Sequence, residues 1–199
     1  KVATLDTEGL FAAELKLAVL GAAETPEQPP SRYVEGLFDD YADRFETSLV
    51  EKLDYSVPQK LAKLIGKAAK GGVFDTIVDI GCGTGLLGVE IRTFANRLEG
   101  FDISQNMLGK AEEKGLYDHL DQADLSLEPE ASGLFTSTLA QHRADLVAAA
   151  DVMMYLGSLE AVMPLVSALL APSGFFAFSV EDAGEEDGFV LRESLRYAH

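Results

Sequence analysis

The sequence predicts an α/β protein in which a doubly wound, mainly parallel sheet carries helices on both faces. Two observations support this prediction. After Gly72, five short apolar runs alternate with segments of helical periodicity, as in parallel sheets that are covered on both sides. A glycine turn at 81–85 also joins the first of these runs to the helix that follows it. Because crossovers between parallel strands are right-handed, the expected sheet is Rossmann-like.

The first thirty residues are expected to form an N-terminal helical extension and a linker. Apolar residues recur at helical spacing over 5–22, in a stripe that includes Phe11, Leu15 and Val19. The stretch 21–30 is polar and rich in proline, which is typical of a linker. We therefore treat 1–30 as a segment separate from the sheet.

Residues 31–72 are expected to form two helices before the sheet. Ser31 can cap a first helix, whose apolar stripe includes Tyr41 and Phe45. A second helix is expected at 58–70, where a proline stands early and two glycines follow the end.

The region 73–199 is expected to contain the sheet. The predicted strands are 74–80, 98–102, 119–123, 145–150 and 175–180, and the predicted helices between them are 86–95, 105–114 and 159–170.

Composition excludes several classes of function. The chain has 16 Lys and Arg against 33 Asp and Glu, and a formal charge of -17 repels nucleic acids and anionic membranes. One cysteine excludes an intrachain disulfide framework, and the three histidines lack metal-ligand spacing, so no metal site is predicted. Acidic residues and prolines interrupt the apolar stretches, which predicts neither a signal peptide nor a membrane helix. We expect a cytoplasmic protein.

The segment 78–88 (VDIGCGTGLLG) predicts a ligand site. Glycine permits positive φ and leaves main chain bare for a ligand, and the start of a helix offers free N–H groups. Asp102 ends the following strand, from which a carboxylate can accept hydrogen bonds from ribose hydroxyls. A cofactor that contains ribose is therefore expected.

Two cofactor classes compete for this turn. Residues 83–88 match the G-x-G-x-x-G pattern of dinucleotide sites, so an NAD-dependent oxidoreductase is one alternative. However, the strand runs directly into Gly81, which makes the loop G-x-G-x-G. Asp79 stands just before it, where a carboxylate suits a cationic amino group better than a pyrophosphate. A non-catalytic interaction module, using the N-terminal helix and the acidic surface, is a further alternative.

With the segments 79–85 (DIGCGTG) and 102–108 (DISQNML), the sequence resembles the class I S-adenosylmethionine-dependent methyltransferases. The resemblance implies that the first segment holds the methionine part of the cofactor and that the second holds its ribose and adenine. The cofactor-binding residues then expected are Tyr41, Asp79, Gly81, Cys82, Gly83, Gly85, Asp102, Ile103, Met107, Ala123, Asp124 and Leu125.

A closer likeness is to bacterial methyltransferases that carry the helix L-F-D-x-Y-A-x-x-F, found here at 37–45, often downstream of tetratricopeptide helices. It implies that 31–72 is a helical lid over the cofactor and that 73–199 is the methyltransferase domain. In this family an antiparallel strand pair usually closes one edge of the sheet. A strand can begin at 189–191, but a complete edge pair is not expected, so the domain is expected to be incomplete at its C-terminal end.

Methyl transfer from a sulfonium is an in-line displacement, for which the protein chiefly aligns donor and acceptor and excludes water. The resemblance places Asp151 and Tyr155, after the fourth strand, near the sulfonium and the substrate. They are the candidate catalytic residues, with a base needed only if the acceptor loses a proton. The sequence thus predicts a methyltransferase for a small-molecule acceptor, with a protein acceptor as the alternative.

Overall fold

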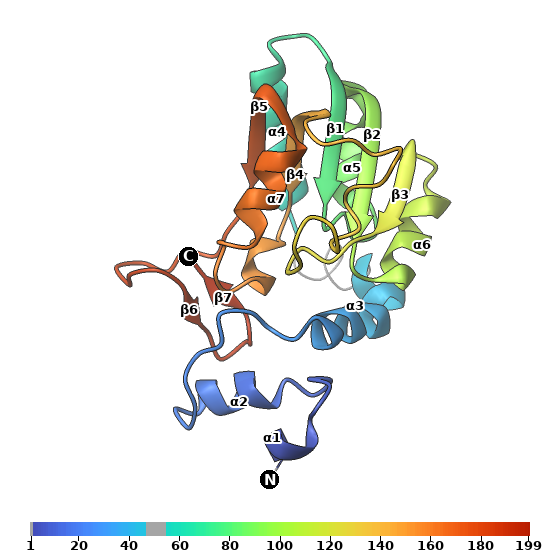
Figure 1. Ribbon diagram of the computed structural model, residues 1–199. Coiled ribbons are helices and arrows are strands. Elements are labelled where there is room, and N and C mark those ends of the chain that lie inside the picture. The colour runs from blue at the N-terminus through green and yellow to red at the C-terminus, as the bar shows by residue number, and fades with distance from the viewer. Residues whose placement is uncertain (1, 47–54) are drawn as a thin grey trace.

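The computed structural model describes residues 2–46 and 55–199. Its main element is a five-stranded sheet in the order β3-β2-β1-β4-β5, and all neighbouring strands are parallel (Figure 1). The strands are β1 (Phe74–Ile80), β2 (Ala95–Asp102), β3 (His119–Gln122), β4 (Ala144–Ala149) and β5 (Leu170–Phe178). The direction of winding reverses between β1 and β4, which confirms the predicted doubly wound, Rossmann-like sheet.

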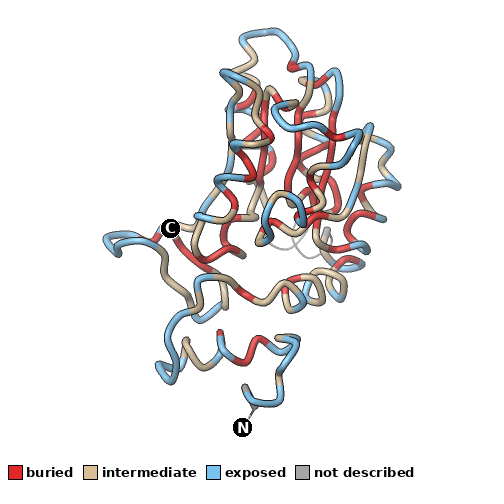
Figure 2. Tube along the Cα trace, viewed as in Figure 1, coloured by how far each residue is buried: buried red, intermediate tan, exposed pale blue. Residues whose placement is uncertain are grey.

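Helices cover both faces of the sheet because its strands are apolar on both sides. On one face, α4 (Val57–Ala69) and α5 (Leu86–Ile91) pack on Ile77 of β1. On the other face, α7 (Val162–Leu169) packs on Val78 and Ile80. Figure 2 shows that buried residues concentrate in the strands between these helices. α6 (Gln105–Glu113) contacts β2 and β3.

The two helices expected at 31–72 have different positions. α3 (Ser31–Glu46) lies across the carboxyl ends of the strands, at the lower side of the sheet in Figure 1. α4, in contrast, belongs to the core on one face of the sheet, where Leu61 and Ile65 are buried. Only α3 is therefore placed to cover a site at the ends of the strands.

The predicted helix at 86–95 ends earlier than expected. α5 stops at Ile91, a 3₁₀ turn occupies Arg92–Phe94, and β2 already begins at Ala95. The Arg92 guanidinium donates hydrogen bonds to the carbonyl oxygens of Ala95 and Asn96, at 2.9 and 3.0 Å, and these bonds stabilise the sharp exit from the helix. β5 likewise begins at Leu170, ahead of the predicted start at 175.

The N-terminal segment does not form the single helix predicted at 5–22. It forms α1 (Val2–Leu5) and α2 (Ala13–Val19), since the Asp6 carboxylate accepts hydrogen bonds from the N–H groups of Phe11 and Ala13 and so ends one turn and starts the next. Phe11, assigned to the apolar stripe, is 65 % exposed, whereas Leu15 is buried. The relation of these helices to tetratricopeptide repeats stays a prediction.

A small antiparallel sheet follows the main one. It consists of β6 (Val190–Leu191) and β7 (Tyr197–Ala198) and packs on the N-terminal segment, because Tyr197 shares a core with Ala12 and Leu15. The strand expected to begin at 189–191 is confirmed. β6 and β7 pair with each other apart from the five-stranded sheet, so they are not the edge pair that usually closes the sheet in the resembled family.

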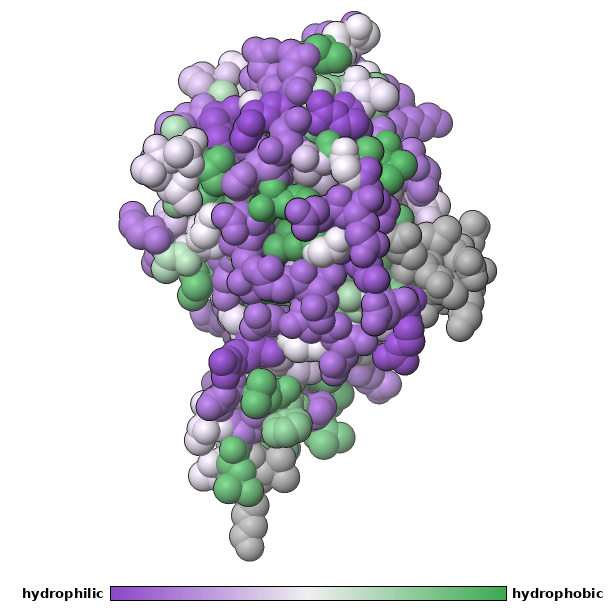
Figure 3. Space-filling model, turned by 90° about the vertical axis from the view of Figure 1, so that its right-hand side faces the viewer, coloured by the Kyte–Doolittle hydropathy of each residue, from purple (hydrophilic) through white to green (hydrophobic). Residues whose placement is uncertain are grey.

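Hydrophobic side chains gather at the lower end of the face shown in Figure 3, where α1 and α2 lie. The large exposed apolar residues of this segment are Leu5, Leu10, Phe11 and Leu20. Among the helices of the described residues, none combines the length and the apolar character that a membrane span requires.

A buried carboxylate fixes β2 to the loop before β4. Glu99 is 1 % exposed and forms ion pairs with Arg143, at 2.8 Å, and with Arg97, at 2.7 Å. Arg143 also donates hydrogen bonds to the carbonyl oxygens of Leu134 and Ala140. The carboxylate of Glu99 in β2 therefore holds the loop that precedes β4.

We expect Glu99→Gln to lower the free energy of unfolding by about 3 kcal/mol, because it leaves two guanidinium groups without their anionic partner. Urea denaturation at pH 7 measures this loss. Glu112→Gln, at an exposed position of α6, is the matched control and should change stability by less than about 0.5 kcal/mol. Equal effects of both substitutions would contradict a role for the buried pairs.

Candidate functional site

A cavity of about 600 Å³ lies between α3 and the carboxyl ends of the strands, where the sheet reverses its winding. This is the usual ligand position in open α/β sheets. The site residues predicted from the sequence that line it are Tyr41, Gly81, Gly83, Asp102, Ile103, Met107, Ala123, Asp124, Leu125, Asp151 and Tyr155. Asp79, Cys82 and Gly85 are not among the lining residues and lie behind the surface of the cavity.

The glycine turn needs glycine for its backbone. Gly81, Gly83 and Gly85 have φ values of 67°, 55° and 85°, in the left-handed region that other residues rarely adopt. A Cβ on Gly81 would lie 2.4 Å from a methyl group of Val152, whereas one on Gly83 would meet no atom within 4 Å. Gly83 therefore presents bare main chain to the cavity.

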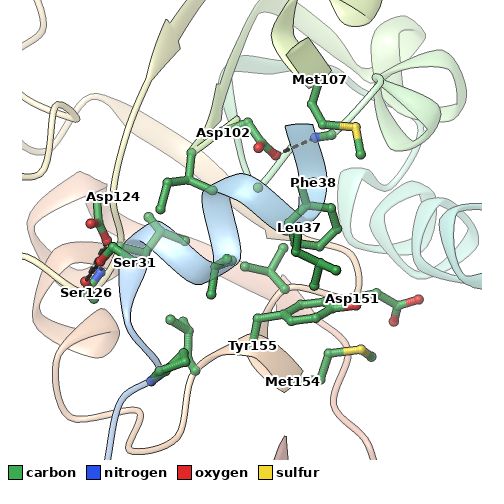
Figure 4. Close-up of a pocket in the computed structure, with 18 of the residues that line it drawn as sticks. Ser31, Leu37, Phe38, Asp102, Met107, Asp124, Ser126, Asp151, Met154 and Tyr155 are labelled. Atoms are coloured by element: carbon green, nitrogen blue, oxygen red, sulfur yellow. Dashed lines mark hydrogen bonds between the residues drawn. The ribbon is translucent and has the colours of Figure 1, made fainter. Parts of the chain in front are cut away.

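Asp102 joins this turn to the end of β2. Its carboxylate accepts a hydrogen bond from the N–H group of Gly83, at 2.8 Å (Figure 4), and another from that of Ser104, at 2.9 Å. Burial raises the pKa of Asp102 to about 6, although both hydrogen bonds oppose the increase. Since each carboxylate oxygen has a second lone pair, Asp102 can still accept hydrogen bonds from a ligand.

Asp79 faces the protein interior on the side of α5. It has no exposed surface; the Tyr117 hydroxyl donates a hydrogen bond of 2.8 Å to its Oδ2, and its Oδ1 has no hydrogen-bond partner. Burial raises its pKa to about 7, the bond from Tyr117 lowers the pKa, and the charge of Asp102 raises it. Cys82 is also buried, and burial keeps the pKa of its thiol above the usual range, so it remains an unreactive thiol.

Tyr117, which sequence reasoning missed, explains the last glycine of the 83–88 match. A Cβ on Gly88 would lie 2.4 Å from the Tyr117 hydroxyl oxygen, and one on Gly100 would lie 2.7 Å from its ring. Gly88 is thus required by a side chain of the protein itself.

Asp124 occupies a separate wall of the cavity. Its Oδ1 accepts hydrogen bonds from the backbone N–H and the hydroxyl of Ser126, at 2.9 and 2.6 Å. The Ser126 hydroxyl is in turn 3.0 Å from that of Ser31, at the start of α3. Asp124 therefore stabilises its own loop through Ser126 and also lines the cavity.

The opposite end of the cavity contains Asp151 and Tyr155 (Figure 4). The Asp151 N–H donates to the Ser179 hydroxyl, which donates back to Oδ1 at 2.7 Å. The Tyr155 ring packs edge-on against Phe38 of α3, with ring centroids 4.9 Å apart. Asp151 itself has a φ of 56°, a strained value for a non-glycine residue.

Tyr55 and Arg196 complete this end, and neither has a sequence signal. Burial, followed by the charge of Asp151 and a hydrogen bond to its carboxylate, raises the pKa of Tyr55 above its ordinary range. Arg196 pairs with Glu181 at 2.8 Å, and its positive charge opposes the increase in the pKa of Tyr155 that burial causes. In the part of the chain that the structure describes, no cluster of three or more His, Cys, Asp and Glu could hold a metal ion.

Comparison with known proteins identifies relatives of this chain. A family model described as a methyltransferase domain matches residues 49–197. The chain is 31% identical over 134 residues to the probable S-adenosylmethionine-dependent methyltransferase CRG1 of Saccharomyces cerevisiae, covering 67% of this chain and 45% of that protein. It is 29% identical over 136 residues to methyltransferase-like protein 27 of Homo sapiens, covering 66% and 54%, respectively. The chain thus spans about half the length of these relatives.

Among solved structures, that of the DhpI-SAH complex shares the fold, with a TM-score of 0.60 and 19% sequence identity. The alignment covers 96% of this chain and 80% of that one.

The buried acid Asp79 should make stability depend on pH. The folded protein keeps its proton up to about pH 7, whereas the unfolded chain releases it at about pH 4, so the folded state binds more protons in between. The free energy of unfolding should therefore fall as the pH rises through this interval. In Asp79→Asn the fall between pH 5 and 7.5, measured by urea denaturation, should be smaller by at least about 1 kcal/mol. The exposed Asp187→Asn should reproduce the wild-type slope, and an unchanged slope in Asp79→Asn would contradict the assignment.

Proposed function

Because this chain belongs to the methyltransferase-domain family, whose model matches residues 49–197, we propose that it is an S-adenosylmethionine-dependent methyltransferase for a small-molecule acceptor. The observation that carries the proposal is the hydrogen bond between the bare main chain of Gly83 and the Asp102 carboxylate in one wall of the cavity. This pairing puts a turn that can contact a ligand beside an acceptor for ribose hydroxyls.

The residues of this wall suit the adenosyl group. Asp102 would accept hydrogen bonds from the ribose, and the buried Met107 would pack on the adenine. Asp124 would accept a hydrogen bond from the adenine amino group. The apolar side chains beside them are Ile103, Ala123 and Leu125, and Tyr41 would cover the ligand from α3.

The glycine turn suits the methionine part. Gly81 and Gly83 line the cavity, while Cys82 and Gly85 give the turn its shape from behind. Asp79 lies beneath the turn, and its Oδ1 has no hydrogen-bond partner. Its pKa is about 7 without a ligand, and a cationic amine bound at the turn would favour its charged form. When bound, the cofactor supplies a methyl group activated by a sulfonium.

The opposite end would receive the acceptor. A volume of about 600 Å³ is within the range of small-molecule sites and has to hold cofactor and acceptor together. Leu37, Phe38 and Met154 form apolar walls there. A small acceptor enclosed beneath α3 fits this geometry better than a side chain of a folded protein.

Asp151 and Tyr155 are the residues that would face the acceptor. When the bond between the methyl carbon and the acceptor atom forms, the bond from that carbon to the sulfonium sulfur would break and leave a neutral thioether. An acceptor hydroxyl or amine would lose a proton, which the Asp151 carboxylate would receive. Ser179 fixes that carboxylate, and Tyr155 would orient the acceptor through its hydroxyl. The packing of Phe38 on Tyr155 helps exclude water.

The cofactor assignment is tested by calorimetry with S-adenosylhomocysteine. The wild-type protein should show saturable binding, and Asp102→Ala should raise the Kd by about 100-fold, or about 2.8 kcal/mol, because acceptors for the ribose are lost. Asp187→Ala, at an exposed loop position, should leave the Kd unchanged. Binding of NADH without binding of S-adenosylhomocysteine by a folded sample would refute the proposal.

The role of Asp151 is tested with radiolabelled S-adenosylmethionine and a panel of small hydroxy, amino and carboxylic compounds. For an acceptor that must lose a proton, Asp151→Asn should reduce kcat at least about 100-fold, while the Kd for S-adenosylhomocysteine stays within about threefold. A variant that keeps its turnover would show that Asp151 is not the base.

A further inference from the structure

Asp39 of helix α3 contacts the start of α6. The Ser104 hydroxyl donates a hydrogen bond to Asp39 Oδ1 at 2.5 Å, and the backbone N–H of Asn106 donates to the same oxygen at 3.3 Å. The Asn106 side-chain amide also donates to the Asp39 carbonyl oxygen. One turn further along both helices, Lys110 pairs with Asp43 at 3.1 Å.

Ser104 links this contact to the cavity. It is buried and is the N-cap of α6, where its hydroxyl oxygen accepts the N–H of Met107 at 3.1 Å. Its own N–H donates to Asp102 Oδ1 at 2.9 Å. Because a carboxylate can only accept a hydrogen bond, the Ser104 hydroxyl proton is directed to Asp39. One serine therefore touches Asp39 and both residues assigned to the adenosine.

The charge of Asp39 suits this position and also has a cost there. A carboxylate near the N-terminus of α6 accepts otherwise unpaired N–H groups and interacts favourably with the helix dipole. The same charge lies near Asp102 and adds to the increase in the pKa of that acid. The N–H groups of Ser104 and Gly83 offset this repulsion because they donate to Asp102.

Asp39 does not line the cavity, although its neighbours on α3 do. Leu37, Phe38 and Tyr41 face the cavity, and Phe38 packs on Tyr155 at the acceptor end. The same helix thus contacts α6 beside the proposed adenosine site and Tyr155 beside the proposed acceptor site.

We propose that Asp39 is a positioning residue for the adenosine half of the cofactor: through Ser104 it holds Asp102 and Met107 in place and fixes α3 above them. The proposal rests on the proposed function and assigns a role to the acid of the L-F-D-x-Y-A-x-x-F helix.

The test measures binding of two ligands that share the adenosine half, S-adenosylhomocysteine and 5′-methylthioadenosine, by calorimetry. Asp39→Ala should raise both Kd values by a similar factor of about ten, since a charge-assisted hydrogen bond to the cap is lost. Asp39→Asn should stay within about threefold, because its amide oxygen can still accept from Ser104 and Asn106. The matched control is Asp40→Ala, an exposed acid on the same helix, which should change neither Kd.

A double-mutant cycle separates positioning from a general weakening of the fold. Ser104→Ala removes the same contact from the other side and should also raise both Kd values about tenfold. In the Ser104→Ala background, Asp39→Ala should raise the Kd values by less than a further factor of about two, because the contact between Asp39 and Ser104 is already absent. If Asp39→Ala does not fold, the test uses the other two variants. Ser104→Ala should still raise both Kd values about tenfold, and Asp39→Asn should still keep both within about threefold.

Wild-type affinity in Asp39→Ala, additive effects in the double variant, or an equal loss in Asp40→Ala would each overturn the inference. Absence of binding by the wild-type protein would instead refute the proposed function. The two failures are therefore distinguishable.

Discussion

The hydrogen bond from the Gly83 N–H to the Asp102 carboxylate connects the elements that build the cavity. A carboxylate as buried as Asp102 requires N–H donors, and the structure supplies one from the turn after β1 and one from the start of α6. This requirement fixes the separation of the two neighbouring strand ends. It also determines where the cap residue Ser104 stands, and hence where α3 can dock.

Acidic residues are concentrated around this cavity, in agreement with a chain of net charge -17. Asp79 and Asp102 have raised pKa values because burial penalises their charged forms. The charge of Asp102 adds to the increase for Asp79, and the charge of Asp39 adds to the increase for Asp102. Without a ligand, ionising both carboxylates is unfavourable, since like charges would be held together out of water. A ligand that carries positive charge relieves this repulsion, whereas an anionic pyrophosphate would add to it.

Features determined by neighbouring residues could be predicted from the sequence, and those determined by distant contacts could not. The alternation of strands and helices, the glycine turn and the position of Asp102 all follow from local periodicity and residue type. Tyr117, Tyr55 and Arg196 come from three different segments and have no pattern that points to the cavity. The helix predicted at 5–22 is divided by side-chain capping from Asp6, which competes with helical hydrogen bonds and is invisible to a periodicity argument.

The small sheet of β6 and β7 bears on how this molecule reaches its folded state. The Tyr197 hydroxyl donates to the carbonyl oxygen of Pro26 across 171 residues, and the Ser158 N–H donates to that of Glu27. Contacts this distant in the chain carry a higher closure entropy than local ones. The segment that leads into α3 can settle only together with residues 189–198, because each supplies half of one core. The roof of the cavity therefore depends on contacts between two stretches of polypeptide that are remote in the sequence.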